Sequence, residues 1–560
     1  MSLRFCTAAL VWSVMLPTCL LAGKLSSDLN GKAPTDEVAV IVQFNVMPNI
    51  ATFEEVSKVG AKLVKAFQFV GQGHFRIAAG KLKDLENNPN VKFITPDRQV
   101  RASMHAARPA VGATAAQSYG WTGDGIAIAV IDSEVADVPD LMDSQCTTSR
   151  VVYRETFPLP GSAAASGHGT HVAGIIAGNG SCAVPVAGSR LLNLTGIAPK
   201  AKIVSLQVLD STGSGYDSSV IAAINRAIEL KTSHNVRIIN LSLSRAPRES
   251  YTLDPLCQAV EAAWKAGIVV ISASGNMGRY QPTSGYGTIG SPGNDPFVIT
   301  VGAMNDKGTE GRGDDVMTSY SSKGPSHLDL VVKPDLVAPG NAIIAPLASL
   351  SATLLNKNTA VATALYAGPG ATIAGPGYIR FSGTSMATPI VAGAVALMLQ
   401  KEPGLNPNQV KARLMKSATK NFPGATTWVD PVTGLAQTIN YDIFTVGAGY
   451  LDITAALASN SLLSNSVLVP LSPRVVRSSR TTVSLVGGSS LVWGDSLVWG
   501  DSLIWGDATF LKGTTILAGS NSLVWGDSTN PTTTSLIWGD SLVWGDSLVW
   551  GDSIFGSGDQ

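Results

Sequence analysis

The sequence predicts an α/β fold in which a mostly parallel, doubly wound sheet is covered by helices on both faces. Several apolar runs of strand length show no polar alternation, which is typical of strands buried on both faces. Helical segments separate these runs, so strands and helices alternate along the chain. The expected strands cover residues 126–131, 202–209, 236–243, 268–273 and 298–303, and the expected helices begin at His168 and cover 220–230 and 256–266.

Polar residues follow two of these strands. Asp132 ends the first strand, and the segment from Ser272 to Asn276 follows a later one. Sheets of this class gather functional groups at the carboxyl ends of their strands. We therefore expect the chemistry of the protein at this edge.

Ser385 lies where an apolar helix begins, within the run Gly-Thr-Ser-Met-Ala-Thr-Pro at 383–389. A helix N-terminus offers unpaired N–H groups and the positive end of the helix dipole. Both would stabilise negative charge on an attacked carbonyl. Taken alone, an ordinary Ser/Thr helix start would give the same pattern.

His168 begins a second apolar helical segment, in the run Ser-Gly-His-Gly-Thr-His at 166–171. A strand-terminal Asp132, His168 and Ser385, in that order, match one convergent arrangement of the acyl-transfer triad. His171 is expected to be a packed histidine, because its spacing from His168 is not that of a zinc helix. With these segments in order, the chain resembles the subtilisin-like serine proteases over roughly residues 120–456.

The resemblance implies a role for each matching residue. Ser385 would be the nucleophile, His168 the general base and Asp132 its orienting partner, while Asn276 would bind the oxyanion. The edge that pairs with substrate backbone and the border of the specificity pocket would be formed by Ser242, Leu243 and Ser244, and by Ser272, Ala273, Ser274 and Gly275. No charge lies in that border, which favours an apolar or broad preference. The family usually has glycine where this chain has Glu134, so the turn after Asp132 is expected to differ.

The charge balance and the expected chemistry indicate which partners and cofactors to expect. Lys+Arg and Asp+Glu both number 40, and no basic stripe indicates a nucleic-acid partner. The chemistry requires no cofactor, and the expected partners are protein or peptide substrates. Structural calcium is suggested by the resemblance alone, since the sequence shows no dependable ligand set.

Residues 1–23 have the pattern of a secretory signal, with Arg4 before an apolar stretch that ends in small residues. We therefore expect a secreted or cell-surface protein, with an N-terminal membrane anchor as the alternative. Cys146, Cys182 and Cys257 would remain after its removal, so at most one disulfide can form among them.

Residues 38–100 predict a small β-α-β-β-α-β unit of ferredoxin-like type. Its first helix, 49–59, would bury Ile50, Phe53, Val56 and Val59 on one face. The unit resembles the inhibitory propeptide of the family, which would make it an inhibitor of its own chain. A linker at 101–119 would contain the maturation site, between Arg101 and Ala116.

Beyond the catalytic region the sequence predicts a linker at 457–489 and a repeat region at 490–560, in which Ser-Leu-Val-Trp-Gly-Asp recurs with a period of six. An even period returns the same residues to one face of a strand. Short β-segments that contact glycans, a cell surface or one another are one interpretation, and low-complexity sequence without a single structure is the other. A surface excursion is expected at 348–379.

The sequence therefore favours a secreted serine endopeptidase made as an autoprocessed precursor. The alternative is a catalytically inert surface or binding protein that acts through its tryptophan repeats. The intact set Asp132, His168, Ser385 and Asn276 favours the enzyme.

Overall fold

The structure is a computed structural model of the 560-residue chain. It describes residues 24–26, 29, 31–97, 99–102, 111, 113–164, 166–180, 194–280, 283–309, 311–355, 359–361, 377–429, 436–460, 470–477 and 482–486, and short tail segments at 503–505, 515–518, 524–525, 536–538 and 543–544. The expected signal segment, 1–23, lies outside the described residues.

Among the described residues, eight strands form the central sheet, in the order β14-β13-β12-β10-β6-β8-β7 with β15 paired to β13. Every pairing in it is parallel except that of β14, which confirms the predicted, mostly parallel sheet. The strands are β6 (Ala127–Asp132), β7 (Val151–Thr156), β8 (Lys202–Gln207), β10 (Val236–Leu241), β12 (Val269–Ala273), β13 (Ile299–Asn305), β14 (Val316–Met317) and β15 (Leu336–Pro339).

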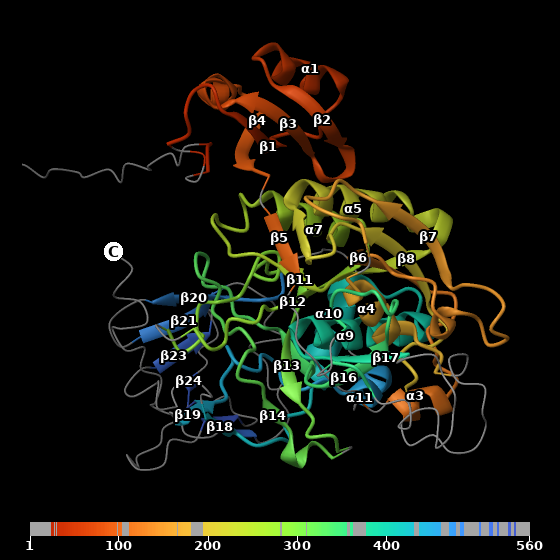
Figure 1. Ribbon diagram of the computed structural model, residues 1–560. Coiled ribbons are helices and arrows are strands. Elements are labelled where there is room, and N and C mark those ends of the chain that lie inside the picture. The colour runs from red at the N-terminus through yellow and green to blue at the C-terminus, as the bar shows by residue number, and fades with distance from the viewer. Residues whose placement is uncertain are drawn as a thin grey trace, which may run out of the picture.

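Helices cover both faces of this sheet (Figure 1). On one face, α4 (His168–Ala177) packs against α9 (Thr384–Lys401), and both contact β6. On the other, α5 (Asp217–Glu229) packs against α7 (Pro255–Lys265). All six residues of β6 are buried, because side chains on both of its faces meet helices. This is the doubly wound arrangement that the uninterrupted apolar runs predicted.

Residues 37–96 form a separate antiparallel sheet in the order β2-β3-β1-β4, with its own core around Phe53 and Phe75. The element order matches the expected β-α-β-β-α-β pattern. Ile50 is an exception: it is 75% exposed, because Asn49 caps the helix and the first residue then points to solvent. The elements are β1 (Glu37–Phe44), α1 (Ile50–Lys58), β2 (Lys62–Phe67), β3 (Gln72–Ala78), α2 (Leu82–Glu86) and β4 (Val91–Pro96).

This N-terminal unit sits on α5 and α7, shown in red and orange above them in Figure 1. Polar groups join the two parts. Gln72 Nε2 donates to Pro255 O at 2.7 Å, and the Ser218 backbone N–H, in the first turn of α5, donates to Asp97 Oδ1 at 2.6 Å. The chain then continues as β5 (Gln99–Ala102) into the catalytic unit, where it lies between β11 (Leu243–Ser244) and β9 (Ser214–Tyr216).

The linker expected at 101–119 is structured at both ends. Its first two residues belong to β5, and α3 (Ala113–Ser118) packs on the main core through the buried side chain of Ala116. The small residues at the end of the predicted linker therefore form a helix, α3. The surface excursion predicted at 348–379 ends earlier than expected. Its last residues belong to β17 (Tyr378–Phe381), which is mostly buried and pairs with β16 (Ile343–Pro346).

The linker expected at 457–489 also contains packed structure. Leu471, Ser472 and Val475 are buried, and β20 (Arg474–Arg477) bridges to Val331 of the catalytic unit. The catalytic body therefore continues beyond residue 456, which sequence composition alone did not reveal. The remaining helices and strands are α6 (Lys231–His234), α10 (Pro407–Ser417), α11 (Ile453–Ala458), β18 (Ala425–Val429), β19 (Ala436–Asn440) and β21 (Thr482–Val486).

The described parts of the tail are short strands centred on the Leu-Val/Ile-Trp portion of the repeats. β22 (Leu503–Trp505) pairs antiparallel with β25 (Leu536–Trp538), and β24 (Val524–Trp525) pairs parallel with β26 (Val543–Trp544). A further strand, β23 (Thr515–Ala518), pairs with β21.

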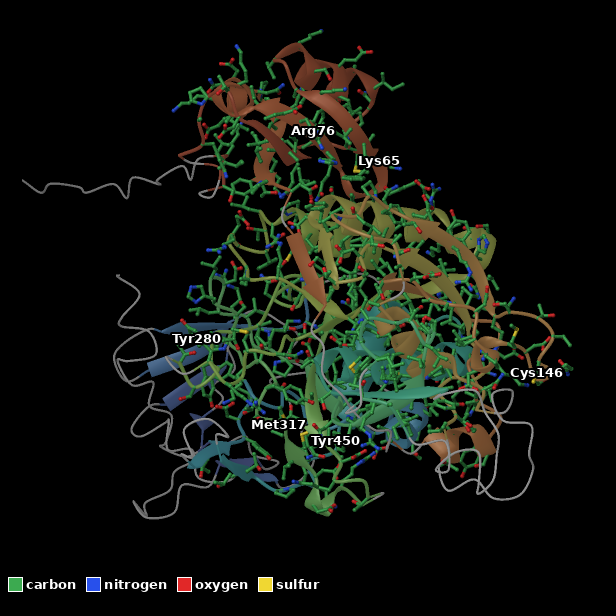
Figure 2. All side chains as sticks on the ribbon, in the orientation of Figure 1. Lys65, Arg76, Cys146, Tyr280, Met317 and Tyr450 are labelled. Atoms are coloured by element: carbon green, nitrogen blue, oxygen red, sulfur yellow. The ribbon has the colours of Figure 1, made fainter. Side chains whose placement is uncertain are left out.

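Two cysteines among the described residues differ in state. Cys257 is free and buried. Cys146 is disulfide-bonded, and Figure 2 shows it on the loop before β7 at the edge of the molecule. None of the described helices is both long enough and apolar enough to cross a membrane.

Candidate active site

Asp132 and His168 meet at the carboxyl edge of the central sheet. Asp132 is the last residue of β6 and His168 the first of α4, and both are fully buried. His168 Nδ1 lies 2.7 Å from Asp132 Oδ1, which also accepts the Ser133 backbone N–H at 2.7 Å. Asp132 Oδ2 and His168 Nε2 have no hydrogen-bond partner among the described residues. The imidazole is thus fixed by one nitrogen, while the other stays available.

A close approach of two backbones brings these side chains together. A Cβ on Gly169 would lie 2.3 Å from Ser133 O, so only glycine allows α4 to cross the end of β6 at this distance. Ser166 Oγ accepts the His168 N–H at 3.2 Å, and Ser133 Oγ accepts the Gly169 N–H at 2.9 Å. These hydroxyls satisfy donors that the helix N-terminus leaves unpaired.

Glu134 does not disturb this turn. It is absent from the non-glycine residues with left-handed backbone, so glycine is not required at this position. Its carbonyl accepts the Thr170 hydroxyl at 3.3 Å. With Glu134 at this position, Asp132 still contacts His168 at 2.7 Å.

Ser385 is the second residue of α9 and is fully buried. Pro389 lies four residues later and has no N–H to donate to the Ser385 carbonyl. That carbonyl instead accepts the Ser242 hydroxyl at 2.8 Å, and Ser385 Oγ donates to Ser242 O at 3.1 Å. The proline therefore leaves an acceptor that ties α9 to the strand edge next to it.

Asn276 is held by one end of its amide. Its Oδ1 accepts both the backbone N–H and the hydroxyl of Thr384, each at 3.0 Å. Its Nδ2 is buried and has no partner among the described residues. Gly275 has a left-handed backbone at φ 107°, and a Cβ there would lie 2.8 Å from Ser322 Oγ. A donor is thus left unused beside the start of α9.

The residues expected to contact substrate line an extended slot. Leu243 and Ser244 form β11, which pairs with Ala102 and Arg101 of β5, while β9 pairs with β5 from the other side. Ser242 precedes this edge. The residues expected to border the pocket lie at the end of β12 and just after it, and the side chains of Ser272 and Ser274 are fully buried.

His171 is a packed histidine, as expected. Its Nε2 contacts Ile343 O at 3.1 Å and its ring lies 4.7 Å from that of Phe381. Burial, with the nearby charge of His168, lowers the pKa of His171 to about 3, which keeps the ring neutral. No group of three or more His, Cys, Asp or Glu residues within the described parts of the chain is arranged to hold a metal ion.

Sequence reasoning missed three polar residues that shape the site: Ser133, Ser166 and Thr384. Each is adjacent to, or two positions from, a residue that the motifs singled out. A search for hydroxyl side chains flanking the motif residues would have found them. Most of their partners could not have been named, because bonds such as Gly169 N–H to Ser133 Oγ and Thr384 N–H to Asn276 Oδ1 join segments far apart in the sequence.

The arrangement is suited to nucleophilic acyl transfer. A carboxylate-bound imidazole with a free nitrogen, a hydroxyl at a helix N-terminus and an unused amide donor are the parts that this chemistry needs. α4 and α9, which carry the imidazole and the hydroxyl, pack against each other.

Comparisons with known proteins point to the same kind of chemistry. A family model described as "Subtilase family" matches residues 123–432. Serine protease AprX of Bacillus subtilis (strain 168) is 36% identical over 344 residues, which span 60% of this chain and 70% of that protein. Subtilisin E of the same organism is 32% identical over 418 residues, which span 73% of this chain and 93% of that protein.

A solved structure shares the fold. The crystal structure of fervidolysin from Fervidobacterium pennivorans, a keratinolytic enzyme related to subtilisin, superposes with a TM-score of 0.54 at 21% identity. The match covers 78% of this chain and 62% of that one. The chain belongs to the subtilase family, and it is a subtilisin-like serine endopeptidase.

Proposed function

We propose that Ser385 attacks the carbonyl carbon of a peptide bond while His168 Nε2 takes its proton. His168 would then give that proton to the leaving amine, and water would release the acyl group by the same route in reverse. Asp132 holds the imidazole through Nδ1 and stabilises its protonated form. The observation that carries this proposal is the 2.7 Å contact of Asp132 with His168 beside an unpartnered Nε2.

The Ser385 hydroxyl would have to rotate to reach the imidazole of His168. Ser385 Oγ donates to Ser242 O at 3.1 Å, and rotation about the Cα–Cβ bond would redirect it toward the imidazole. The tetrahedral oxyanion would be bound by Asn276 Nδ2 and the Ser385 backbone N–H. The unpartnered state of Nδ2 supports this role, because Thr384 fixes the other end of the amide.

Substrates would bind as an added strand between β9 and β11, with Ser242, Leu243 and Ser244 supplying backbone partners. The residues from Ser272 to Gly275 would border the pocket for the side chain before the scissile bond. The pairing of β5 in this slot supports the first statement, since it places an extended segment of the chain between β9 and β11.

The N-terminal unit would act as a propeptide that inhibits in cis. β5 fills the slot that substrate needs, and α5 and α7 hold the unit in place. Maturation would cut within residues 103–112, between β5 and α3, and would release the slot. We further propose export directed by residues 1–23, giving a secreted or cell-surface enzyme that acts on proteins. The chemistry uses only groups of the chain itself.

A fluorophosphonate probe and casein test this function together. The probe is expected to label the mature protein and to stop its digestion of casein, while Ser385→Ala prevents labelling, digestion and maturation. A mature parent protein that is neither labelled nor active would favour the inert surface protein instead.

A further inference from the structure

β9 and β11, the two strands that pair with β5, run in the same direction, so their carboxyl ends lie at the same end of the slot. β9 and β11 both run antiparallel to β5, so they are parallel to each other. One strand lies between them, which sets them apart by two interstrand spacings, about 9–10 Å. Asp217 is the first residue after β9, and Arg245 is the first residue after β11.

These two residues form a buried ion pair across that gap. Arg245 Nε lies 2.9 and 3.0 Å from the two carboxylate oxygens of Asp217. Arg245 Nη2 donates to Asp254 Oδ1 at 2.7 Å, and Asp254 Oδ2 accepts the Ser291 hydroxyl at 2.8 Å. The side chain of Arg245 is 5% exposed, and those of both aspartates are fully buried.

Each charge in this cluster has further support. Asp217 and Asp254 lie at the N-termini of α5 and α7, where the helix dipoles favour negative charge. Burial alone would lower the pKa of Arg245, but the charges of Asp217 and Asp254 outweigh it and raise that pKa above its ordinary value. The Arg245 backbone exchanges two hydrogen bonds with Ser291, at 3.0 and 2.8 Å. The pair is therefore a fixed connection.

We propose that Arg245 is a positioning residue that sets the width of the substrate slot by binding Asp217 across it. The inference rests on the proposed function and deepens it. In β5, Arg101 pairs with both Ser214 and Ser244, and the ion pair lies beyond that point, alongside the residues that precede Arg101. The clamp thus acts on substrate residues distant from the scissile bond.

Arginine suits this task better than lysine. A guanidinium presents several N–H groups in a fixed plane, so it can bind one carboxylate through Nε and a second through Nη2. A lysine ammonium has no such fixed geometry, and it could not hold both aspartates at the same separation.

Two peptide substrates test the clamp. They share the residues around the scissile bond, but one has two residues before it and the other has five. Active sites are counted by fluorophosphonate titration of each mature protein, and kcat/KM is measured for both peptides. In Arg245→Met the advantage of the long peptide is expected to fall about tenfold, the effect of one or two poorly aligned backbone hydrogen bonds. The short peptide should change less than about twofold.

Three further variants separate positioning from general stability. Asp217→Asn weakens the same pair while Asp254 still binds Arg245, and it should lower the ratio by a smaller factor; it also serves if Arg245→Met does not fold. Arg245→Lys should recover only part of the ratio. Arg413→Met removes a different ion pair, in which the arginine is buried and the glutamate is partly exposed: Arg413 Nη1 with Glu402 Oε1 at 2.8 Å. It should leave the ratio unchanged.

An unchanged ratio in both Arg245→Met and Asp217→Asn would overturn the clamp, and so would an equal loss for both peptides. A parent protein that takes no probe and cleaves neither peptide would instead overturn the proposed function, so the two failures are distinguishable.

Discussion

Two buried charge clusters of the catalytic unit differ in how completely their polar atoms are used. In the first, Asp335 binds Lys333 Nζ at 2.7 Å and Lys411 Nζ at 3.0 Å, and all three side chains are fully buried. The Lys411 ammonium also donates to three backbone carbonyls and to Ser472 Oγ. In the second, Asp132 and His168 are equally buried, yet Asp132 Oδ2 and His168 Nε2 have no partner within the described chain.

The difference separates architecture from chemistry. A buried polar group without a partner costs free energy, so folding alone does not explain why one persists. The Asp335 cluster satisfies its groups and joins the 470–477 segment to the core through Ser472. The Asp132–His168 pair leaves His168 Nε2 without a partner among the described residues, and Asn276 leaves its Nδ2 without one. The proposed acyl transfer uses both of these nitrogens. Changes to the first cluster should therefore affect stability, and changes to the second should affect rate.

The largest expected effect is on rate. Ser385→Ala or His168→Ala should lower kcat by about 10⁶-fold, the size measured for the corresponding changes in a subtilisin. Ser385→Ala should change stability little, because it removes only a hydroxyl. His168→Ala also leaves the buried Asp132 without its partner and should be less stable. Peptide cleavage is measured at fixed times, and the rate of the probe-labelled, inactive parent is subtracted as the blank. A kcat within tenfold of the parent would contradict the assignment of the catalytic serine and histidine.

Lys411→Met should act on stability alone. Removing one partner of a buried ion pair costs about 3–5 kcal/mol. Lys333 still binds Asp335 in this variant, but Asp335 Oδ1 and three buried backbone carbonyls lose the Lys411 ammonium. Denaturant unfolding in the Ser385→Ala background measures this loss without self-digestion, while kcat of the active form stays unchanged at low temperature. Lys416→Met is the control, since Lys416 is half-buried on the same helix α10 and should cost less than about 1 kcal/mol. Equal losses in the two variants would contradict the comparison.

Asn276→Ala should lower kcat by about 10²–10³-fold with little change in KM, as a missing oxyanion donor does in a subtilisin. Thr384→Ala leaves the amide in place but removes one of the two donors that hold Asn276 Oδ1, so a loss of about tenfold is expected. Steady-state kinetics on one peptide measure both. A larger loss in Thr384→Ala than in Asn276→Ala would show that the amide does not bind the oxyanion.

The smallest effect concerns pH at the boundary between the N-terminal unit and α5. His74 Nε2 lies 3.6 Å from Asp97 Oδ2. Burial raises the pKa of Asp97 to about 7, although bonds from Ser218 oppose the shift, and burial with the charge of Arg76 lowers the pKa of His74 to about 4. The raised pKa means that the stability contributed by Asp97 is lost as pH rises from about 4 to about 7. The lowered pKa means that the contribution of His74 is lost as pH falls from about 6.5 to about 4.

The two contributions oppose each other in the parent, and single variants should separate them. In the Ser385→Ala background, Asp97→Asn should raise Tm by a few degrees at pH 7 and hardly at pH 4, while His74→Gln should do the reverse. Thermal unfolding at both pH values measures this. Parallel pH profiles for the parent and both variants would mean that neither group titrates on unfolding.

Much of the site could be predicted from the sequence because its elements carry local signals. An uninterrupted apolar run that ends in Asp132, and glycines on either side of His168, are patterns within a few residues of the chain. The structure confirms the parallel sheet that these runs predicted and brings Asp132 to His168. It also agrees with the expected packing of His171.

Other features depend on residues that are far apart in the sequence and have no local pattern. Ser472 reaches Asp335 across 137 positions, so composition suggested a linker where the chain is packed. The predicted linker at 101–119 includes α3 (Ala113–Ser118), a helix whose residue Ala116 is buried against the core. Ile50 has the helical spacing of a core residue, yet the cap at Asn49 places it at the solvent-facing start of α1.

The sequence by itself determined the fold class and the order of the acidic, imidazole and hydroxyl residues, because hydrophobic period and helix-start chemistry are local properties. Only the tertiary structure decided that Arg245 faces Asp217 across the slot, that Pro389 frees a carbonyl for Ser242, and that β5 lies between two strands of the catalytic unit. Those contacts are selected by the packing of whole elements, and no short stretch of sequence encodes which distant partner will be within reach.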